Sequence, residues 1–374
     1  MAAPHPLLID LAAGRKPGLL SPRDGPALLA SAHEHRMSGL LWSSVTKGTV
    51  ELPPSQLRTL AMRDLAVQSH HRRLWSALAA VHHRLSPLAV NVAAVKGVSA
   101  EWRWYDRIGE RPCNDLDLLL DPSALPKVGQ VLAALGSRYV PTDAERLLRA
   151  GILQSVDVDL AGIEIDLHVD LLKIEVPTRN GRRLWSRTTT LSGPLGVESL
   201  VIDPETSLVH FLIHLHKDRF SRLLGFADVA RILATEDVEW DYIDAFLARE
   251  GLQVLAYSAL HAVVRHLNLP APPTKVPRGW RARTWRSLWP DNEHLLGDLG
   301  YARRLGHHHF WIPWLAKGRV GEAARWFARR RAFPPPSLLD VYYPNIRGPY
   351  LVRLTVGRAR SWKRNSETEK PSIT

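Results

Sequence analysis

Two aspartates in one short run, Asp115 and Asp117, are the residues of this chain whose type and spacing best fit a chemical role. They open the segment Asp115-Leu116-Asp117-Leu118-Leu119-Leu120, whose apolar run is typical of a buried strand. Successive strand side chains point to opposite faces, so both carboxylates project from the same face. Neighbouring carboxylates raise each other's pKa unless a cation lies between them, and Mg²⁺ typically binds such acids together with substrate phosphates. The alternative is a pair of solvated acids at the start of a strand.

A second acidic face follows later in the chain. Apolar residues from Ile163 to Val169 alternate with four polar ones, a period of two that predicts a strand. The polar residues are Glu164, Asp166, His168 and Asp170. If this strand lies beside the one with Asp115 and Asp117, Asp166 completes a three-carboxylate metal site. His168 then lies one step further along the same face, close enough to contact an acceptor or a phosphate. The alternative is a solvated, polar edge.

A lysine and a glycine, Lys96-Gly97, separate a candidate strand over 90–95 from a candidate helix over 99–105. Backbone N–H groups at a helix start bind phosphate, and glycine permits close approach of the anion. Lys96 offers a further positive charge. Arg111 stands just before the acidic strand, where it either contacts phosphates or pairs with Asp115.

The spacing of His210 and His214 would suit two metal ligands on one helix face. The segment has no glutamate in a His-Glu-x-x-His arrangement and no nearby cysteine, so packed or substrate-facing histidines are the favoured interpretation. The adjacent pair His70-His71 is expected at a surface or boundary.

The composition favours a cytoplasmic protein with a large core. The chain has 374 residues, of which 45% are hydrophobic, and a single cysteine, Cys113, which excludes an internal disulfide. The sequence shows no secretion signal and no run of about 18 apolar residues that could cross a bilayer. Residues 301–374 have a net charge of +11, against +1 for residues 1–300. This basic tail could contact a polyanion (nucleic acid, an acidic protein or a membrane surface) or be a solvated face.

The pattern of helix and strand signals predicts an α+β fold in four regions. They are an N-terminal helical region (1–84), a core with strands (85–200), a helical subdomain (201–270), and a proline-rich linker with a basic helical tail (271–374).

Several motifs taken together resemble the bacterial nucleotidyltransferase-like proteins of the DNA polymerase β-type nucleotidyltransferase superfamily. They are Lys96-Gly97, Tyr105, Arg111-Pro112, Asp115-Leu116-Asp117 and Asp166-Leu167-His168, and the resemblance continues through His214 and Asp228. It covers roughly residues 55–270 and implies a short mixed sheet backed by helices, with added helical regions at both ends.

The resemblance also implies roles for these residues. Asp115 and Asp117 would coordinate two Mg²⁺ ions, and Asp166 would bind the ion nearest the acceptor and help to deprotonate its hydroxyl. The acceptor, on a small molecule, peptide or protein, would attack the α-phosphate of an NTP, expected to be ATP, and release pyrophosphate. Gly97 would cradle the triphosphate, while Lys96 and Arg111 offset its charge.

One departure separates this chain from much of the superfamily, which has Gly-Ser or Gly-Gly where this sequence has Lys96-Gly97. Two alternatives stay open at this point. A metal-dependent glycosyltransferase also uses an Asp-x-Asp motif, and a non-catalytic nucleotide- or RNA-binding module could retain the same fold.

Overall fold

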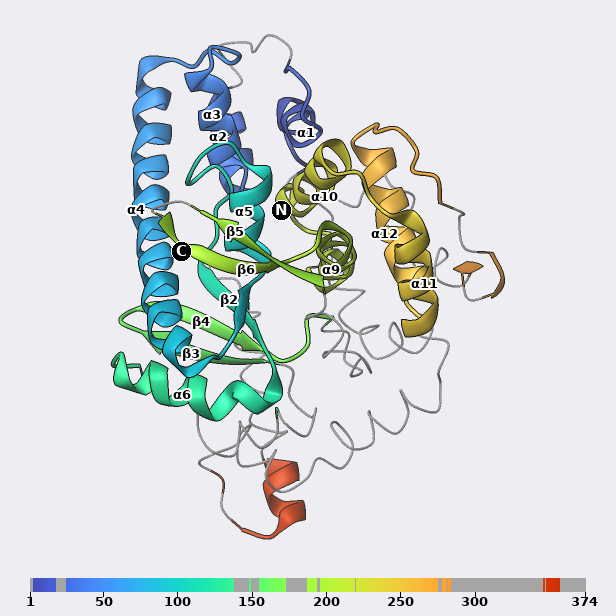
Figure 1. The fold of residues 1–374 in the computed structure, drawn as a ribbon. Helices are drawn as coiled ribbons and strands as arrows, with labels where there is room; N and C mark the ends of the chain where they lie inside the picture. Colours follow the sequence, from blue (N-terminus) through green and yellow to red (C-terminus); the bar gives the residue numbers. More distant parts are fainter. Residues whose placement is uncertain are drawn as a thin grey trace.

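The computed structural model describes residues 3–17, 25–137, 148, 155–172, 187–193, 196–218, 220–274, 278–280, 282–283, 346 and 348–356. The N-terminal region is helical, as the sequence predicts, and its helices are α1 (Pro6–Ala12), α2 (Gly25–Glu34), α3 (Ser38–Thr46) and α4 (Pro54–Leu85). The long helix α4 runs along one side of the molecule (Figure 1). It begins at Pro54, where the fixed φ of proline suits the first helical position.

A six-stranded mixed sheet forms the centre of the described chain. Its strands are β1 (Val92–Ala94), β2 (Asp115–Leu120), β3 (Ser155–Leu160), β4 (Ile163–His168), β5 (Thr188–Ser192) and β6 (Glu198–Ile202). Their order is β3-β4-β2-β1-β6-β5. The strand β2 runs parallel to β4 and β1 runs parallel to β6, while the other neighbours are antiparallel. The predicted short mixed sheet with helices is thus confirmed.

One face of the sheet is largely apolar and packs against helices. The inward residues of β2 and β4 are Leu116, Leu118, Leu120, Ile163, Ile165 and Leu167. They share a core with the second half of α4, including Trp75, and with α6 (Leu125–Ala134), which closes the bottom of this face in Figure 1. Because side chains alternate along each strand, Asp117, Asp166 and His168 belong to the opposite face.

That opposite face meets the helical region after the sheet. Its helices are α9 (Pro204–Lys217), α10 (Leu223–Thr235), α11 (Trp240–Glu250) and α12 (Gln253–His266). Asp203 caps α9 by accepting a 2.6 Å hydrogen bond from the backbone N–H of Thr206. These helices share a second core with α1 and with Leu119 of the sheet. The acidic face of the sheet is therefore covered by helices that precede the sheet in the sequence and by helices that follow it.

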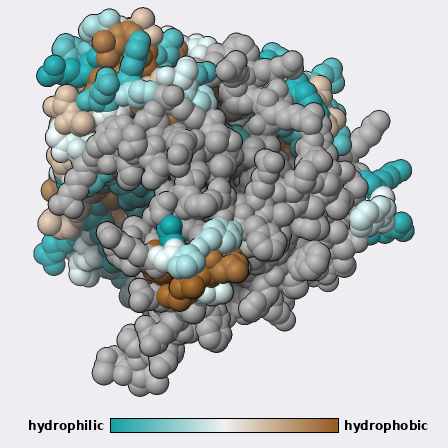
Figure 2. All heavy atoms as spheres, turned by 90° about the horizontal axis from the view of Figure 1, so that it is seen from below, coloured by the Kyte–Doolittle hydropathy of each residue, from teal (hydrophilic) through white to brown (hydrophobic). Residues whose placement is uncertain are grey.

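The remaining described elements are α5 (Lys96–Trp104) and two short 3₁₀ helices, η1 (Ser86–Leu88) and η2 (Pro122–Ala124). Most of the predicted proline-rich linker and basic helical tail (271–374) lies outside the described residues. Residues 350–356 are helical, with Leu351 and Val352 exposed, and Figure 2 shows apolar atoms on the face where this helix lies. Among the described helices, none is both long enough and apolar enough to cross a bilayer.

Candidate active site

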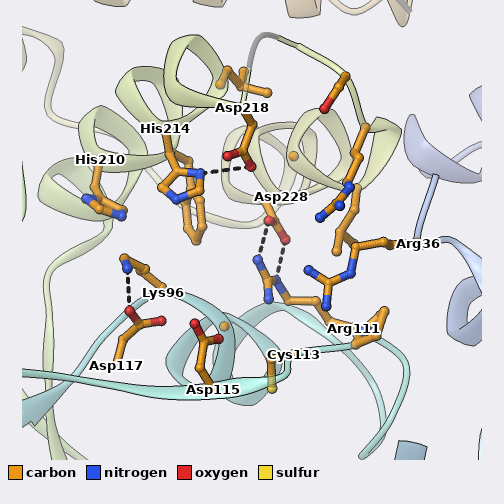
Figure 3. A pocket seen from close by; sticks show the side chains of 18 of the residues that line it. Arg36, Lys96, Arg111, Cys113, Asp115, Asp117, His210, His214, Asp218 and Asp228 are labelled. Carbon is orange, nitrogen blue, oxygen red and sulfur yellow. Dashed lines mark hydrogen bonds and ion pairs between the residues drawn. The ribbon is translucent and has the colours of Figure 1, made fainter. Parts of the chain in front are cut away.

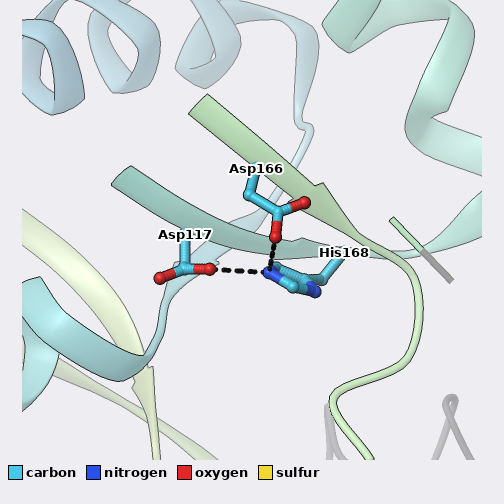
Figure 4. Close-up of side chains that lie close together, drawn as sticks. All are labelled: Asp117, Asp166 and His168. Atoms are coloured by element: carbon cyan, nitrogen blue, oxygen red, sulfur yellow. Dashed lines mark hydrogen bonds and ion pairs between the residues drawn. The ribbon is translucent and has the colours of Figure 1, made fainter. Parts of the chain in front are cut away.

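The parallel pairing of β2 with β4 aligns the two acidic segments. In this register Asp117 lies opposite Asp166, and Leu119 lies opposite His168. One ligand atom each from Asp117, Asp166 and His168 falls within a group less than 4.8 Å across (Figure 4). All three side chains are buried, so the alternative of a solvated polar edge is wrong for this part of β4. The juxtaposition on which the three-carboxylate interpretation depends is present.

Polar contacts inside this group are dense. Nε2 of His168 lies 2.7 Å from Oδ1 of Asp117 and 2.9 Å from Oδ2 of Asp166. The ammonium of Lys96 donates to the same Oδ1 of Asp117 and lies 3.7 Å from Oδ2 of Asp166. His168 is thus enclosed among the acids, whereas the sequence places it at a phosphate or an acceptor.

The surroundings shift the pKa values of Asp117 and Asp115 in opposite directions. Burial raises the pKa of Asp117, but the hydrogen bond from His168 and the charge of Lys96 outweigh it, so the net direction is downward. The pKa of Asp115 is raised, first by burial and then by the negative charge of Asp117. Two carboxylates and an imidazole nitrogen are a donor set that divalent cations accept, so the residues present fit a metal ion. Asp115 lies outside the group of three but lines the same pocket.

A cavity of about 260 Å³ opens between these strands and helix α9 (Figure 3). Asp115, Asp117 and Asp166 contribute to one wall, and His210 and His214 contribute to the other. Nδ1 of His210 lies 2.9 Å from the carbonyl oxygen of Leu171, and burial lowers the pKa of this histidine well below its usual value. Within the described chain, the side chains whose ligand atoms lie close enough to hold a metal ion are those of the sheet, and this histidine pair is not among them.

Arg111 has a different partner from the one that the sequence suggests. Its Nε and Nη2 each donate a 2.7 Å hydrogen bond to Asp228 of α10, and the hydroxyl of Tyr105 donates to the same carboxylate. Pairing with Asp115 is therefore wrong. Burial opposes the charge of Arg111, but Asp228 outweighs it and raises the pKa of the guanidinium, which stays charged. Arg111 still lines the pocket.

Gly97 lies one residue inside α5, which begins at Lys96, three residues earlier than predicted. A Cβ at this position would lie 2.6 Å from Cβ of Cys113. Close packing of α5 against the loop that precedes β2 therefore requires glycine. The Cys113 thiol is buried, and its pKa is raised well above the ordinary value, as fits a structural residue.

A buried histidine, His71, holds the loop that contains Cys113 and precedes β2. The backbone N–H of Cys113 donates to Nε2 of His71 at 3.0 Å, so the other ring nitrogen of His71 donates to Glu101 at 2.8 Å. His71 is fully buried, and its expected place at a surface is wrong. The signal that could have indicated burial is its position on the apolar stripe of α4 with Leu74 and Leu78.

Three charged residues of the pocket, Arg36, Asp218 and Arg222, were not identified from the sequence. Nδ1 of His214 lies 3.2 Å from Oδ2 of Asp218, a pair whose spacing of four residues was available as a signal. Arg36 lies in a turn after α2 and Arg222 directly precedes α10, and no local pattern marks either of them.

Comparison with known proteins identifies the family of the chain. None of the curated proteins compared matches the chain. Among solved structures, it is similar to an antigenic nucleotidyltransferase-like protein from Paracoccidioides brasiliensis, with 15% identity and a TM-score of 0.28 over 50% of this chain and 92% of that one. The model of the uncharacterised nucleotidyltransferase family matches residues 21–268, which is more than half of the chain. The resemblance found in the sequence is thereby confirmed, and the chain is an enzyme that belongs to this nucleotidyltransferase family.

Proposed function

We propose that this enzyme transfers a nucleoside monophosphate from an NTP, expected to be ATP, to an acceptor hydroxyl on a small molecule, peptide or protein. The observation that supports this most directly is the alignment of Asp117 with Asp166 across two parallel strands, at a pocket that Asp115 also lines. Mg²⁺ is the expected metal, and Asp115, Asp117 and Asp166 would hold it. When bound, the metal ions stabilise negative charge on the attacking and leaving oxygens.

The residues divide the work of one displacement. The acceptor oxygen forms a bond to the α-phosphorus while the bond from that phosphorus to the α,β-bridging oxygen breaks. The electron pair of the broken bond leaves with pyrophosphate. Asp166 takes the proton of the acceptor hydroxyl. The backbone at Gly97, which lines the pocket at the start of α5, would cradle the triphosphate. The family match favours this reaction over glycosyl transfer through the Asp-x-Asp motif.

The test is a double variant of the first two acids. Asp115→Asn together with Asp117→Asn should abolish Mg²⁺-dependent ATP binding, measured by calorimetry, without unfolding the protein. Glu164→Gln is the matched control, because Glu164 lies on the neighbouring strand but is exposed. Undiminished metal-linked ATP binding in the double variant would refute the metal assignment.

Incubation of cell extract with the enzyme and α-labelled NTPs would identify the acceptor. Contact of the basic tail with a polyanion stays a prediction.

A further inference from the structure

The two cations expected to offset the charge of the triphosphate already have partners within the protein. Lys96 donates to Asp117, and Arg111 is held by both oxygens of Asp228. A charge that is neutralised by a buried carboxylate has little attraction left for a phosphate. The positive charge that the polyphosphate needs must therefore come in part from other residues.

Two further arginines, Arg36 and Arg222, line the same pocket. Within the described residues, no carboxylate forms an ion pair with Arg36 or with Arg222. Nη2 of Arg36 donates a 2.8 Å hydrogen bond to the side-chain amide oxygen of Asn114, which is a neutral group. Arg36 is half-buried and Arg222 is exposed at the pocket, so both guanidinium groups are available to a ligand.

The positive charges of these arginines act on one another. The pKa of Arg36 is lowered, first by burial and then by the charges of Arg111 and Arg222. Repulsion of this kind is relieved when an anion enters between the groups. The planar guanidinium fork also matches the geometry of phosphate oxygens, which a point charge does not.

The pocket has arginines at one end and acidic residues toward the other, which is the arrangement of charge that a bound triphosphate requires. Figure 3 shows Arg36 beside Arg111 at one end, with Lys96 and Asp117 at the other and Asp115 between them. An α-phosphate at the acidic end, where metal binds, leaves the terminal phosphates directed toward the arginines.

We infer that Arg36 and Arg222 form an anion subsite for the β- and γ-phosphates of the nucleotide. This inference rests on the proposed function and deepens it, because it names the residues that distinguish a triphosphate from a nucleotide with fewer phosphates. The same subsite holds the negative charge that develops on the leaving pyrophosphate. Arg36 precedes α3 and Arg222 precedes α10. The N-terminal helical region and the helical region after the sheet therefore both contribute to the site.

Calorimetry on the full chain with Mg²⁺ tests the subsite, with inorganic tripolyphosphate, ATP and AMP as probes. Arg36→Met with Arg222→Met should weaken tripolyphosphate and ATP binding at least tenfold and AMP binding less than twofold. The control, Arg58→Met with Arg265→Met, removes the same charge from exposed positions outside the pocket and should change each affinity less than twofold. The variants Arg36→Lys and Arg222→Lys, which keep the charge, should retain the thermal unfolding midpoint and show an intermediate affinity.

The outcomes separate this subsite from the reaction itself. Wild-type affinity for tripolyphosphate in the double methionine variant would overturn the subsite. If Asp115→Asn with Asp117→Asn still abolished ATP binding in that case, the proposed function would stand. A wild-type protein that binds neither ATP nor tripolyphosphate would overturn both.

Discussion

The ammonium of Lys96 lies 3.0 Å from Nε2 of His168, among the side chains that form the candidate metal site. Burial opposes this charge, but the carboxylates of Asp117 and Asp166 outweigh it and raise the pKa of Lys96. A divalent cation that enters the group therefore meets a positive charge already held there. Lys96, expected from the sequence to contact phosphate, acts in this arrangement on the acids themselves.

Replacing Lys96 by methionine should strengthen metal binding in the absence of nucleotide, because a competing cation is removed. We expect the affinity for Mn²⁺, followed by electron paramagnetic resonance, to rise by about tenfold, which equals about 1.4 kcal/mol. Lys127→Met is the matched control, since Lys127 is exposed on α6 and does not line the pocket. Equal or weaker Mn²⁺ binding in Lys96→Met would argue against competition at this site.

Asp166 and Glu164 offer a paired test on one strand. Both belong to the same face of β4, but Asp166 is buried at the pocket and Glu164 is exposed. Asp166→Asn should reduce nucleotidyl transfer by roughly 10²–10⁴-fold, the usual contribution of a general base, while ATP binding largely survives. Glu164→Gln should have a much smaller effect. The rates are measured with α-labelled NTP and the identified acceptor, and similar rates for wild type and Asp166→Asn would contradict the assigned role.

The buried ion pair between Arg111 and Asp228 should be costly to break from one side. Asp228→Leu leaves the Arg111 charge without its partner, and we expect a loss of about 3–5 kcal/mol in the free energy of unfolding. Adding Arg111→Met should restore much of this loss, because no charge is then left buried alone. Urea denaturation of the two variants measures both effects. A double variant no more stable than Asp228→Leu would show that the pair does not act as a unit.

His216 predicts how stability changes with pH. Burial lowers its pKa to about 4, although a hydrogen bond to the carbonyl oxygen of Leu255 favours the charged form. Below the unfolded-state pKa of about 6.5 the unfolded chain takes up a proton that the folded chain refuses, so stability falls as the pH falls from there to about 4. Between pH 7 and pH 5, wild type should lose about 2 kcal/mol more than His216→Gln in denaturant titrations. Parallel losses in the two proteins would contradict this.

Local pattern was sufficient for the parts of the site that lie on single strands. The alternation around Asp166 predicted its face, and the apolar run after Asp117 predicted a buried strand; both predictions depend on a period that the sequence displays. The partner of Arg111 could not be predicted in this way, since Asp228 lies 117 residues further along and the pair forms only when α10 packs against the core.

The last two strands along the chain, β5 at one edge of the sheet and β6 beside it, were also missed as elements. Their segments are short, and the polar residues of β5 do not alternate clearly with apolar ones. Arg36 and Arg222 were missed for a related reason, because a single arginine in a turn has no periodic context from which its environment follows.

The parallel register of β2 with β4 also ties catalysis to the completion of folding. Asp117 and Asp166 meet only after a long intervening segment has been closed into a crossover, and contacts of such sequence separation are costly in chain entropy and slow to form. A slip of one residue in this pairing would turn Asp166 toward α4 and bring an apolar side chain to the pocket. A single residue inserted within β4 before Asp166 would therefore leave the strand able to pair but remove the Asp166 carboxylate from the pocket.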